Sequence, residues 1–169
     1  MAKFDPHQVL GKVTEALIET RELAASADSV AAVLRKAIPA IDEFGLAKYD
    51  SRRNRFVVAA SSTEDGKVSN VGNRTSGETC SLGGYLLKAG HAVMINAVEA
   101  FSQQGGTDVR EQFDQPVESL LAELLEREGE PLGFAYATSR DKSAFTEEHR
   151  DMLDTASGVF SLAFQNALA

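Results

Sequence analysis

The 169-residue chain has a single cysteine, Cys80, and no tryptophan. One thiol cannot close an internal disulfide, so a reducing compartment is expected and the cytoplasm is the natural one. Basic residues are also few, because 17 lysines and arginines stand against 25 aspartates and glutamates, for a net charge of −8. Nucleic acids and anionic membranes are bound by basic surfaces, so the sequence predicts neither as a partner.

Long apolar runs are missing as well. None reaches the roughly 20 residues that a membrane-spanning helix needs, and residues 1–7 lack the apolar core of a signal peptide. The histidines are scattered, and no pair has the spacing of metal ligands on one element. The acidic residues form no recognisable catalytic arrangement. We therefore expect a cytoplasmic chain that binds no metal and is not an enzyme.

What is present is ordinary globular composition, with 43% hydrophobic and 25% charged residues. The length suits one domain, with an N-terminal helix over residues 1–26 and a core over residues 28–168 that includes the C-terminal helix. Pro6 suits the first turn of the first helix, and Asp28 is expected to cap a second helix that ends near Ile41. The first helix carries a heptad-like seam of Val9, Val13, Ala16, Thr20 and Leu23.

Alternating and apolar segments predict five strands, of which the first two form a hairpin. Ser81 is expected to cap a short helix that Gly90 ends. Thr146 caps a final helix whose apolar stripe is wider than one sheet face requires, so part of it is available to a partner chain. The polar segments 61–79 and 99–116 are predicted as long loops, with one helical turn at 108–113. The predicted strands are 44–49, 56–60, 92–98, 119–125 and 132–138.

This order predicts an α+β fold around a central antiparallel sheet. Three segments are more specific: Phe44-Gly-Leu-Ala-Lys-Tyr-Asp50, then 82–96, then Ser119-Leu-Leu-Ala with Pro131-Leu-Gly133 and Phe145-Thr-Glu-Glu148. A PAS domain has a similar order of elements, but these segments resemble a GAF domain more closely. The first resembles the opening strand with its aromatic-Asp end, the second a helix-turn-strand, and the third the closing hairpin and helix.

The resemblance implies N- and C-terminal helices on one sheet face. On the other face, the short helix and the long loops would enclose a pocket. GAF domains sense cyclic nucleotides, bilins, haem, amino-acid-like molecules or anions, and many only dimerise. Here His149 replaces the acidic partner expected for cyclic nucleotides, and Ser81 rather than histidine follows Cys80, which disfavours a bilin. One cysteine also excludes the thiol-disulfide turnover of GAF-like methionine sulfoxide reductases. The cofactor is therefore unknown.

The candidate pocket follows from side-chain alternation in the last strand. Phe134 and Tyr136 share one face, and the small residues Gly133 and Ala137 share the other, where helices can approach closely. Filling of the core by the aromatic rings is the alternative. Glu123 interrupts an apolar strand and is either exposed, paired with an arginine or recruited by a cationic ligand. The full candidate set is Cys80, Tyr85, Asn96, Phe101, Ser119, Glu123, Phe134 and Tyr136.

The function predicted from these features is small-molecule sensing in signal transduction. The ligand is unidentified, the chain is a homodimer through its first and last helices, and a signalling partner protein receives the output. Ligand binding would order the two long loops and shift the sheet against the terminal helices. The alternatives are a dimerisation scaffold with a filled pocket, and a redox switch that uses Cys80.

Overall fold

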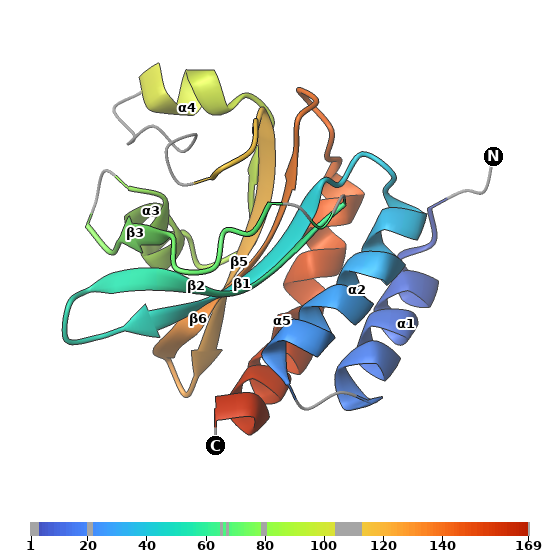
Figure 1. Cartoon of the computed structure of the whole chain (residues 1–169), viewed down its shortest axis with the longest axis horizontal. Helices are drawn as coiled ribbons and strands as arrows, with labels where there is room; N and C mark the ends of the chain where they lie inside the picture. The colour runs from blue at the N-terminus through green and yellow to red at the C-terminus, as the bar shows by residue number, and fades with distance from the viewer. Residues whose placement is uncertain are drawn as a thin grey trace.

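The computed structural model describes residues 4–19, 22–64, 66, 68–78, 81–103 and 113–168. These residues form one curled antiparallel sheet with helices on both sides (Figure 1). The order of the six strands across the sheet is β3-β2-β1-β6-β5-β4. The strands are β1 (Glu43–Asp50), β2 (Arg55–Thr63), β3 (Arg74–Ser76), β4 (Val93–Ile95), β5 (Ser119–Arg127) and β6 (Glu130–Ser139).

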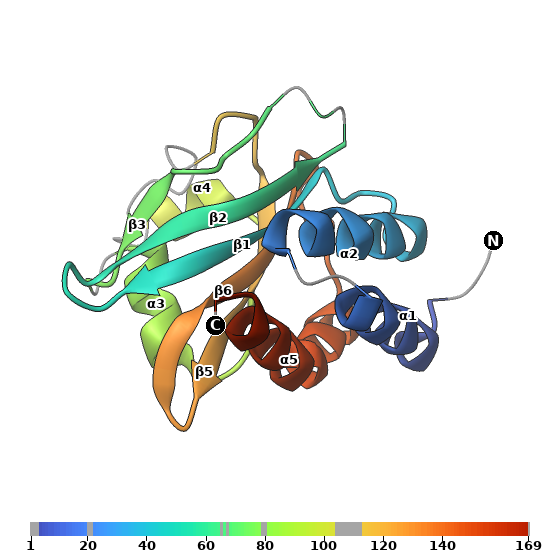
Figure 2. The same ribbon diagram turned by 60° about the horizontal axis from the view of Figure 1, so that its bottom comes forward.

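Three long helices lie on one side of the sheet: α1 (Pro6–Glu19), α2 (Leu23–Ala37) and α5 (Glu147–Leu168). Helices α2 and α5 pack on the sheet, and α1 packs against these two helices. Two short helices, α3 (Leu82–Ala89) and α4 (Val98–Gln103), lie over the other face, as Figure 2 shows after rotation. Each face therefore has its own apolar cluster. The predicted α+β fold, with terminal helices on one face and short helices on the other, is confirmed. No helix in the described ranges is long and apolar enough to cross a membrane.

Alternation along β6 separates the two clusters as predicted. Ala135 and Ala137 pack under the helices, whereas Phe134 and Tyr136 belong to the cluster on the opposite face. A Cβ added to Gly133 would lie 3.2 Å from the Phe164 ring and would collide with the backbone of β1. The absence of a side chain at that glycine therefore lets α5 approach the sheet.

The helix caps also match the sequence. Asp5 Oδ1 accepts hydrogen bonds from the first backbone N–H groups of α1, and Thr146 Oγ1 accepts one from His149 N. Ser81 caps α3 by accepting from Gly84 N at 3.1 Å. Gly90 closes α3 with a φ of 71°, a left-handed conformation that glycine adopts at no steric cost.

Several predicted boundaries were wrong. The second helix begins at Leu23, so Asp28 lies exposed inside it rather than at its cap, and it ends at Ala37. The alanine-rich start of this segment favours helix before Asp28 is reached. The predicted loop over 61–79 contains β3, which pairs with β2. The predicted strand over 92–98 has only Val93–Ile95 in the sheet, and α4 follows it. Most of the predicted turn at 108–113 lies outside the described residues.

Candidate functional site

A hydrogen-bonded network of buried polar side chains lies on the sheet face that α3 and α4 cover. Its centre is Glu43 at the start of β1, which has no exposed surface. From the sheet, Tyr136 OH and Ser61 Oγ donate to Glu43 Oε2 at 2.8 and 2.5 Å. From the connecting segments, Asn70 Nδ2 and Gln115 Nε2 donate to Glu43 Oε1 at 2.9 and 2.8 Å. One carboxylate thus joins two strands to two loops.

The loop side of the network is also connected within itself. Asn70 Oδ1 accepts from Asn73 Nδ2 at 3.0 Å and from Asp114 N at 2.8 Å. Asn70 Nδ2 also donates to Gln115 Oε1 at 2.8 Å. The segment after β2 and the segment before β5 are therefore held together at one fully buried asparagine.

Tyr136 is placed by a glycine on the neighbouring strand. Gly45 lies opposite Tyr136 in the register of β1 and β6, and a Cβ at Gly45 would fall on the tyrosine ring. The ring therefore lies flat across β1, with its hydroxyl at Glu43. Burial, followed by the charge and hydrogen bond of Glu43, raises the pKa of Tyr136 well above its ordinary value. Tyr136 OH is thus the donor in its hydrogen bond with Glu43.

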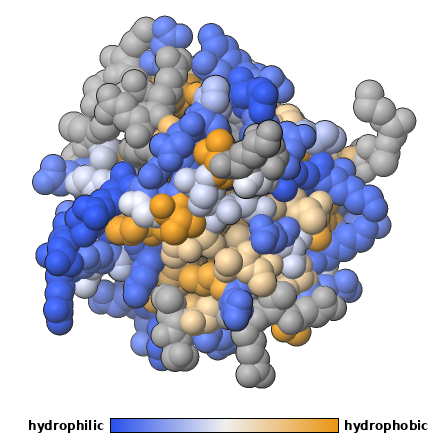
Figure 3. Space-filling view, in the orientation of Figure 1, coloured by the Kyte–Doolittle hydropathy of each residue, from blue (hydrophilic) through white to orange (hydrophobic). Residues whose placement is uncertain are grey.

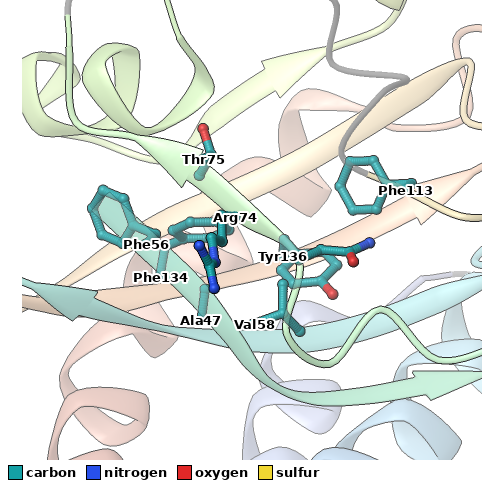
Figure 4. Close-up of a pocket in the computed structure, with 9 residues that line it drawn as sticks. Ala47, Phe56, Val58, Arg74, Thr75, Phe113, Phe134 and Tyr136 are labelled. Carbon is teal, nitrogen blue, oxygen red and sulfur yellow. The ribbon is translucent and has the colours of Figure 1, made fainter. Parts of the chain in front are cut away.

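Aromatic rings fill most of the space beside Tyr136 (Figure 4). The ring centroids of Phe134 and Phe113 lie 5.7 and 5.6 Å from that of Tyr136, and Phe56 packs against Phe134 at 5.0 Å. The remaining cavity has a volume of about 10 Å³, which is close to the minimum for one water molecule. Its rim is more polar, with Asn73, Arg74 and Thr75. A larger ligand therefore requires movement of the covering segments.

One buried hydroxyl beside the network is unpaired. Thr138 lies directly across from Glu43 in the β1–β6 register. It has no exposed surface, and its Oγ1 has no hydrogen-bond partner in the described part of the chain. Buried hydroxyls are normally paired, so this position has unused capacity to bind a polar group.

Comparisons with known proteins identify the fold. No protein-family model and no curated relative matches the sequence. Among solved structures, the GAF domain of an Acinetobacter phosphoenolpyruvate-protein phosphotransferase superposes with a TM-score of 0.76 at 15% identity, covering 99% of this chain and 96% of that one. The chain has a GAF-like fold. The resemblance inferred from the three sequence segments is therefore confirmed at the level of fold.

Other solved structures with this GAF-like fold are enzymes. A free methionine-R-sulfoxide reductase from Neisseria meningitidis, in complex with its substrate, has a TM-score of 0.75 at 19% identity, covering 99% of this chain and 95% of that one. A type II enzyme of the same activity from Thermoplasma acidophilum has a TM-score of 0.63 at 19% identity, covering 90% and 95%. From the sequence we expected that the chain is not an enzyme. That expectation is wrong, because enzymes are among the solved structures to which this chain is similar.

Only part of the predicted site set comes together in the GAF-like structure. Phe134 and Tyr136 line one cavity. Tyr85 and Phe101 instead pack edge to face at 5.5 Å between α3 and α4, and Tyr85 is half exposed. Cys80 lies outside the described residues.

Asn96 and Ser119 have partners that fix a loop rather than line the cavity. Asn96 Oδ1 accepts a hydrogen bond from Phe145 N, and Asn96 Nδ2 donates one to the carbonyl of Phe145. Ser119 Oγ donates to Asp141 O at 2.6 Å. Both residues hold the segment between β6 and α5 against β4 and β5.

Glu123 is on the opposite face of the sheet from Tyr136. The neighbours at i−2 and i+2, Leu121 and Leu125, both pack in the cluster under the long helices, and Glu123 faces Asp154 of α5. The prediction that it shares a pocket with Tyr136 does not agree with this placement, because strand alternation puts odd-numbered residues of β5 on the helix side.

Sequence reasoning missed the centre of the network. Glu43 comes one residue before the predicted start of its strand, and Asn70 and Gln115 lie in segments without periodicity. A signal was present for Glu43, because extending β1 by one residue puts it on the same face as Gly45 and Ala47. Among the described residues, no group of three or more histidine, cysteine or acidic side chains is arranged to hold a metal.

Proposed function

We propose that the chain is a sensor-type GAF-like domain that binds a small molecule over the Glu43 network. The observation that carries the proposal is the position of Glu43, which is the shared acceptor for side chains of the sheet and of both covering segments. A polar ligand that enters here competes with Asn70 and Gln115 for Glu43 and can reach the unpaired Thr138 hydroxyl. Binding would therefore move both segments together.

Transmission would use the helices on the other side of the same strands. Glu43 and Tyr136 lie on β1 and β6, whose other faces pack against α2 and α5. A ligand can shift the protein between two arrangements only through its different affinity for each. Two arrangements are proposed. In one, the segments 68–78 and 113–118 are closed on Glu43, and in the other a ligand has opened them.

The output is proposed to be a homodimer formed through α1 and α5, which acts on a signalling partner protein. Ile18 of α1 and Leu162 of α5 support this because they are 75% and 59% exposed although apolar. In the space-filling view, weakly polar and hydrophobic residues gather over α2 and α5 within a hydrophilic surround (Figure 3). Apolar surface of this kind is often covered by a partner.

The first experiment is native mass spectrometry of the protein from its own host, before and after denaturation. A non-covalent mass that is lost on denaturation identifies the ligand. Hydrogen exchange then tests the site, because that ligand should change protection in residues 68–78 and 113–118. Asn70→Ala should abolish the change, whereas Ser69→Ala, an exposed neighbour, should retain it. If protection stays the same in both segments at saturating ligand, the proposed site is wrong.

Free methionine-R-sulfoxide reduction is the second candidate function, favoured by the match of the Neisseria meningitidis enzyme over nearly the whole chain. In the net reaction the oxygen would pass from the sulfoxide to the Cys80 thiolate: the S–O bond of the substrate breaks, a Cys80 S–O bond forms, and methionine leaves. One proton from solvent completes the sulfenic acid. Because a single cysteine cannot complete turnover within the chain, an external thiol would take the place of the second cysteine. It would condense with the sulfenic acid, releasing water and forming a disulfide that a second external thiol reduces. Methionine formation from the free sulfoxide and dithiothreitol, lost in Cys80→Ser, would favour this candidate over sensing.

A further inference from the structure

A second group of acidic residues lies on the helix side of the sheet, away from the Glu43 network. Glu123 of β5 is only 6% exposed, and its neighbour across the sheet is Ala135 of β6. The Oε2 atom of Glu123 has no hydrogen-bond partner among the described residues. An isolated buried carboxylate is costly, so this side chain requires a proton or a cation.

Asp154 of α5 is the acidic neighbour that Glu123 meets across the contact between β5 and α5. Both side chains line one hollow between β5 and α5, and Asp154 Oδ1 accepts a hydrogen bond from Ala92 N at 3.1 Å, just before β4. Two carboxyl groups can hydrogen-bond to each other only when one of them carries a proton. Burial first, then the hydrogen bond and charge of Asp154, and then the charge of Glu126 raise the pKa of Glu123 to about 9.

The other charged groups near the pair do not replace the proton. Glu126, Arg127 and Glu128 line the same hollow between β5 and α5, and Arg127 is the only cation among the described residues that line it. From the β4 side, the exposed His91 directs its Nδ1 toward the carbonyl of Ala92. Acidic groups therefore outnumber the basic one among the described residues of the hollow.

We propose that Glu123 and Asp154 form a proton-sharing pair that links the docking of α5 on the sheet to the uptake of one proton. The pair joins three elements, because Glu123 belongs to β5, Asp154 belongs to α5, and the Ala92 amide precedes β4. Ionisation of both carboxyl groups would oppose two charges across the contact between α5 and β5 and would leave one of them buried. The last helix would then separate from the sheet more readily.

The direction of the pH dependence follows from the raised pKa of Glu123. The folded state holds the proton more tightly than the unfolded chain, in which the pKa of the carboxyl is near 4.5. The stabilisation is therefore complete below about pH 4.5 and is lost as the pH rises towards about 9. For one proton, the ratio of folded to unfolded molecules falls about tenfold per pH unit across this window.

The test compares urea unfolding of the wild type, Glu123→Gln and Glu126→Gln from pH 5 to pH 9. Glutamine keeps a neutral donor towards Asp154. Glu123→Gln should therefore remove the tenfold fall, per pH unit, in the ratio of folded to unfolded molecules. Glu126→Gln changes an exposed carboxyl on the same strand. It should keep most of the wild-type dependence of the folded-to-unfolded ratio on pH. Parallel pH profiles for the wild type and Glu123→Gln would overturn the proposal.

Two further measurements keep the test decisive if Glu123→Gln does not fold. The ¹³C carboxyl resonance of Glu123 in the wild type should titrate near pH 9, and titration near 4.5 would refute the shared proton. Amide exchange in α5, corrected for the intrinsic effect of pH, should accelerate between pH 7 and pH 9. An acceleration confined to other elements would refute the link to helix docking.

Discussion

At the scale of single residues, Tyr136 tests whether the Glu43 network is energetically important. Tyr136→Phe removes one hydroxyl donor and leaves the ring packing intact. We expect a loss of about 1.5–3 kcal/mol in the free energy of unfolding, the range for hydrogen bonds to charged groups. Urea denaturation measures the loss. Tyr49→Phe is the control because its hydroxyl bonds to Asn54 in an exposed turn, and it should change stability by less than about 0.5 kcal/mol.

Gly45 and Gly11 form a matched pair of glycine positions. A methyl group at Gly45 would overlap the Tyr136 ring, whereas one at Gly11 on α1 meets nothing within 4 Å. We expect Gly45→Ala to lower the unfolding free energy by about 1–3 kcal/mol through overpacking. Gly11→Ala should raise it by about 0.5–1 kcal/mol because alanine favours a helix. Equal midpoints in thermal denaturation for the two variants would contradict the packing argument.

Residues of the site were predictable where the signal was local. Period-two alternation placed Phe134 and Tyr136 on the correct face, because strand geometry alone determines which way successive side chains point. The partners of Tyr136 were not predictable in the same way. Its hydroxyl meets Glu43, 93 positions away in sequence, and Glu43 meets Gln115, 72 positions away. Only the fold brings these groups together.

At the scale of elements, α3 depends on its cap. Ser81 Oγ accepts from Gly84 N and also donates to the carbonyl of Glu78 at 2.7 Å. Ser81→Ala should therefore cost about 0.5–2 kcal/mol. The loss should appear as faster amide exchange in α3, with little change in α5. Ser51→Ala, in the exposed turn between β1 and β2, is the control and should leave exchange in α3 unchanged.

Elements with terminal signals were predicted more accurately than those without. The caps Asp5, Ser81 and Thr146 gave correct helix starts because capping involves residues only a few positions apart. The strand β3 was missed because it has three residues and only one of them is buried. It forms only because β2 offers an edge to pair with. Such a pairing produces no recognisable pattern in the sequence of a three-residue segment.

At the scale of the whole molecule, the proposed dimer can be tested directly. The double variant Ile18→Glu and Leu162→Glu places charges on the exposed apolar positions of α1 and α5. We expect the wild type to sediment as a dimer and this variant as a monomer, because charges are disfavoured at the centre of an interface. Val71→Glu is the control at another exposed apolar site. A monomeric wild type would rule out the dimer.

The order of strands in the sheet also determines when this protein can fold during synthesis. The central pairing joins β1 to β6, with Phe44 opposite Ala137, so the edge of β1 stays open while the intervening residues emerge from the ribosome. Neither core can close before β6 arrives, because both clusters include residues of that strand. Contacts so distant in sequence slow folding. A nascent chain that stalls before Glu130 would present an unpaired β1 edge, a template for association with other chains.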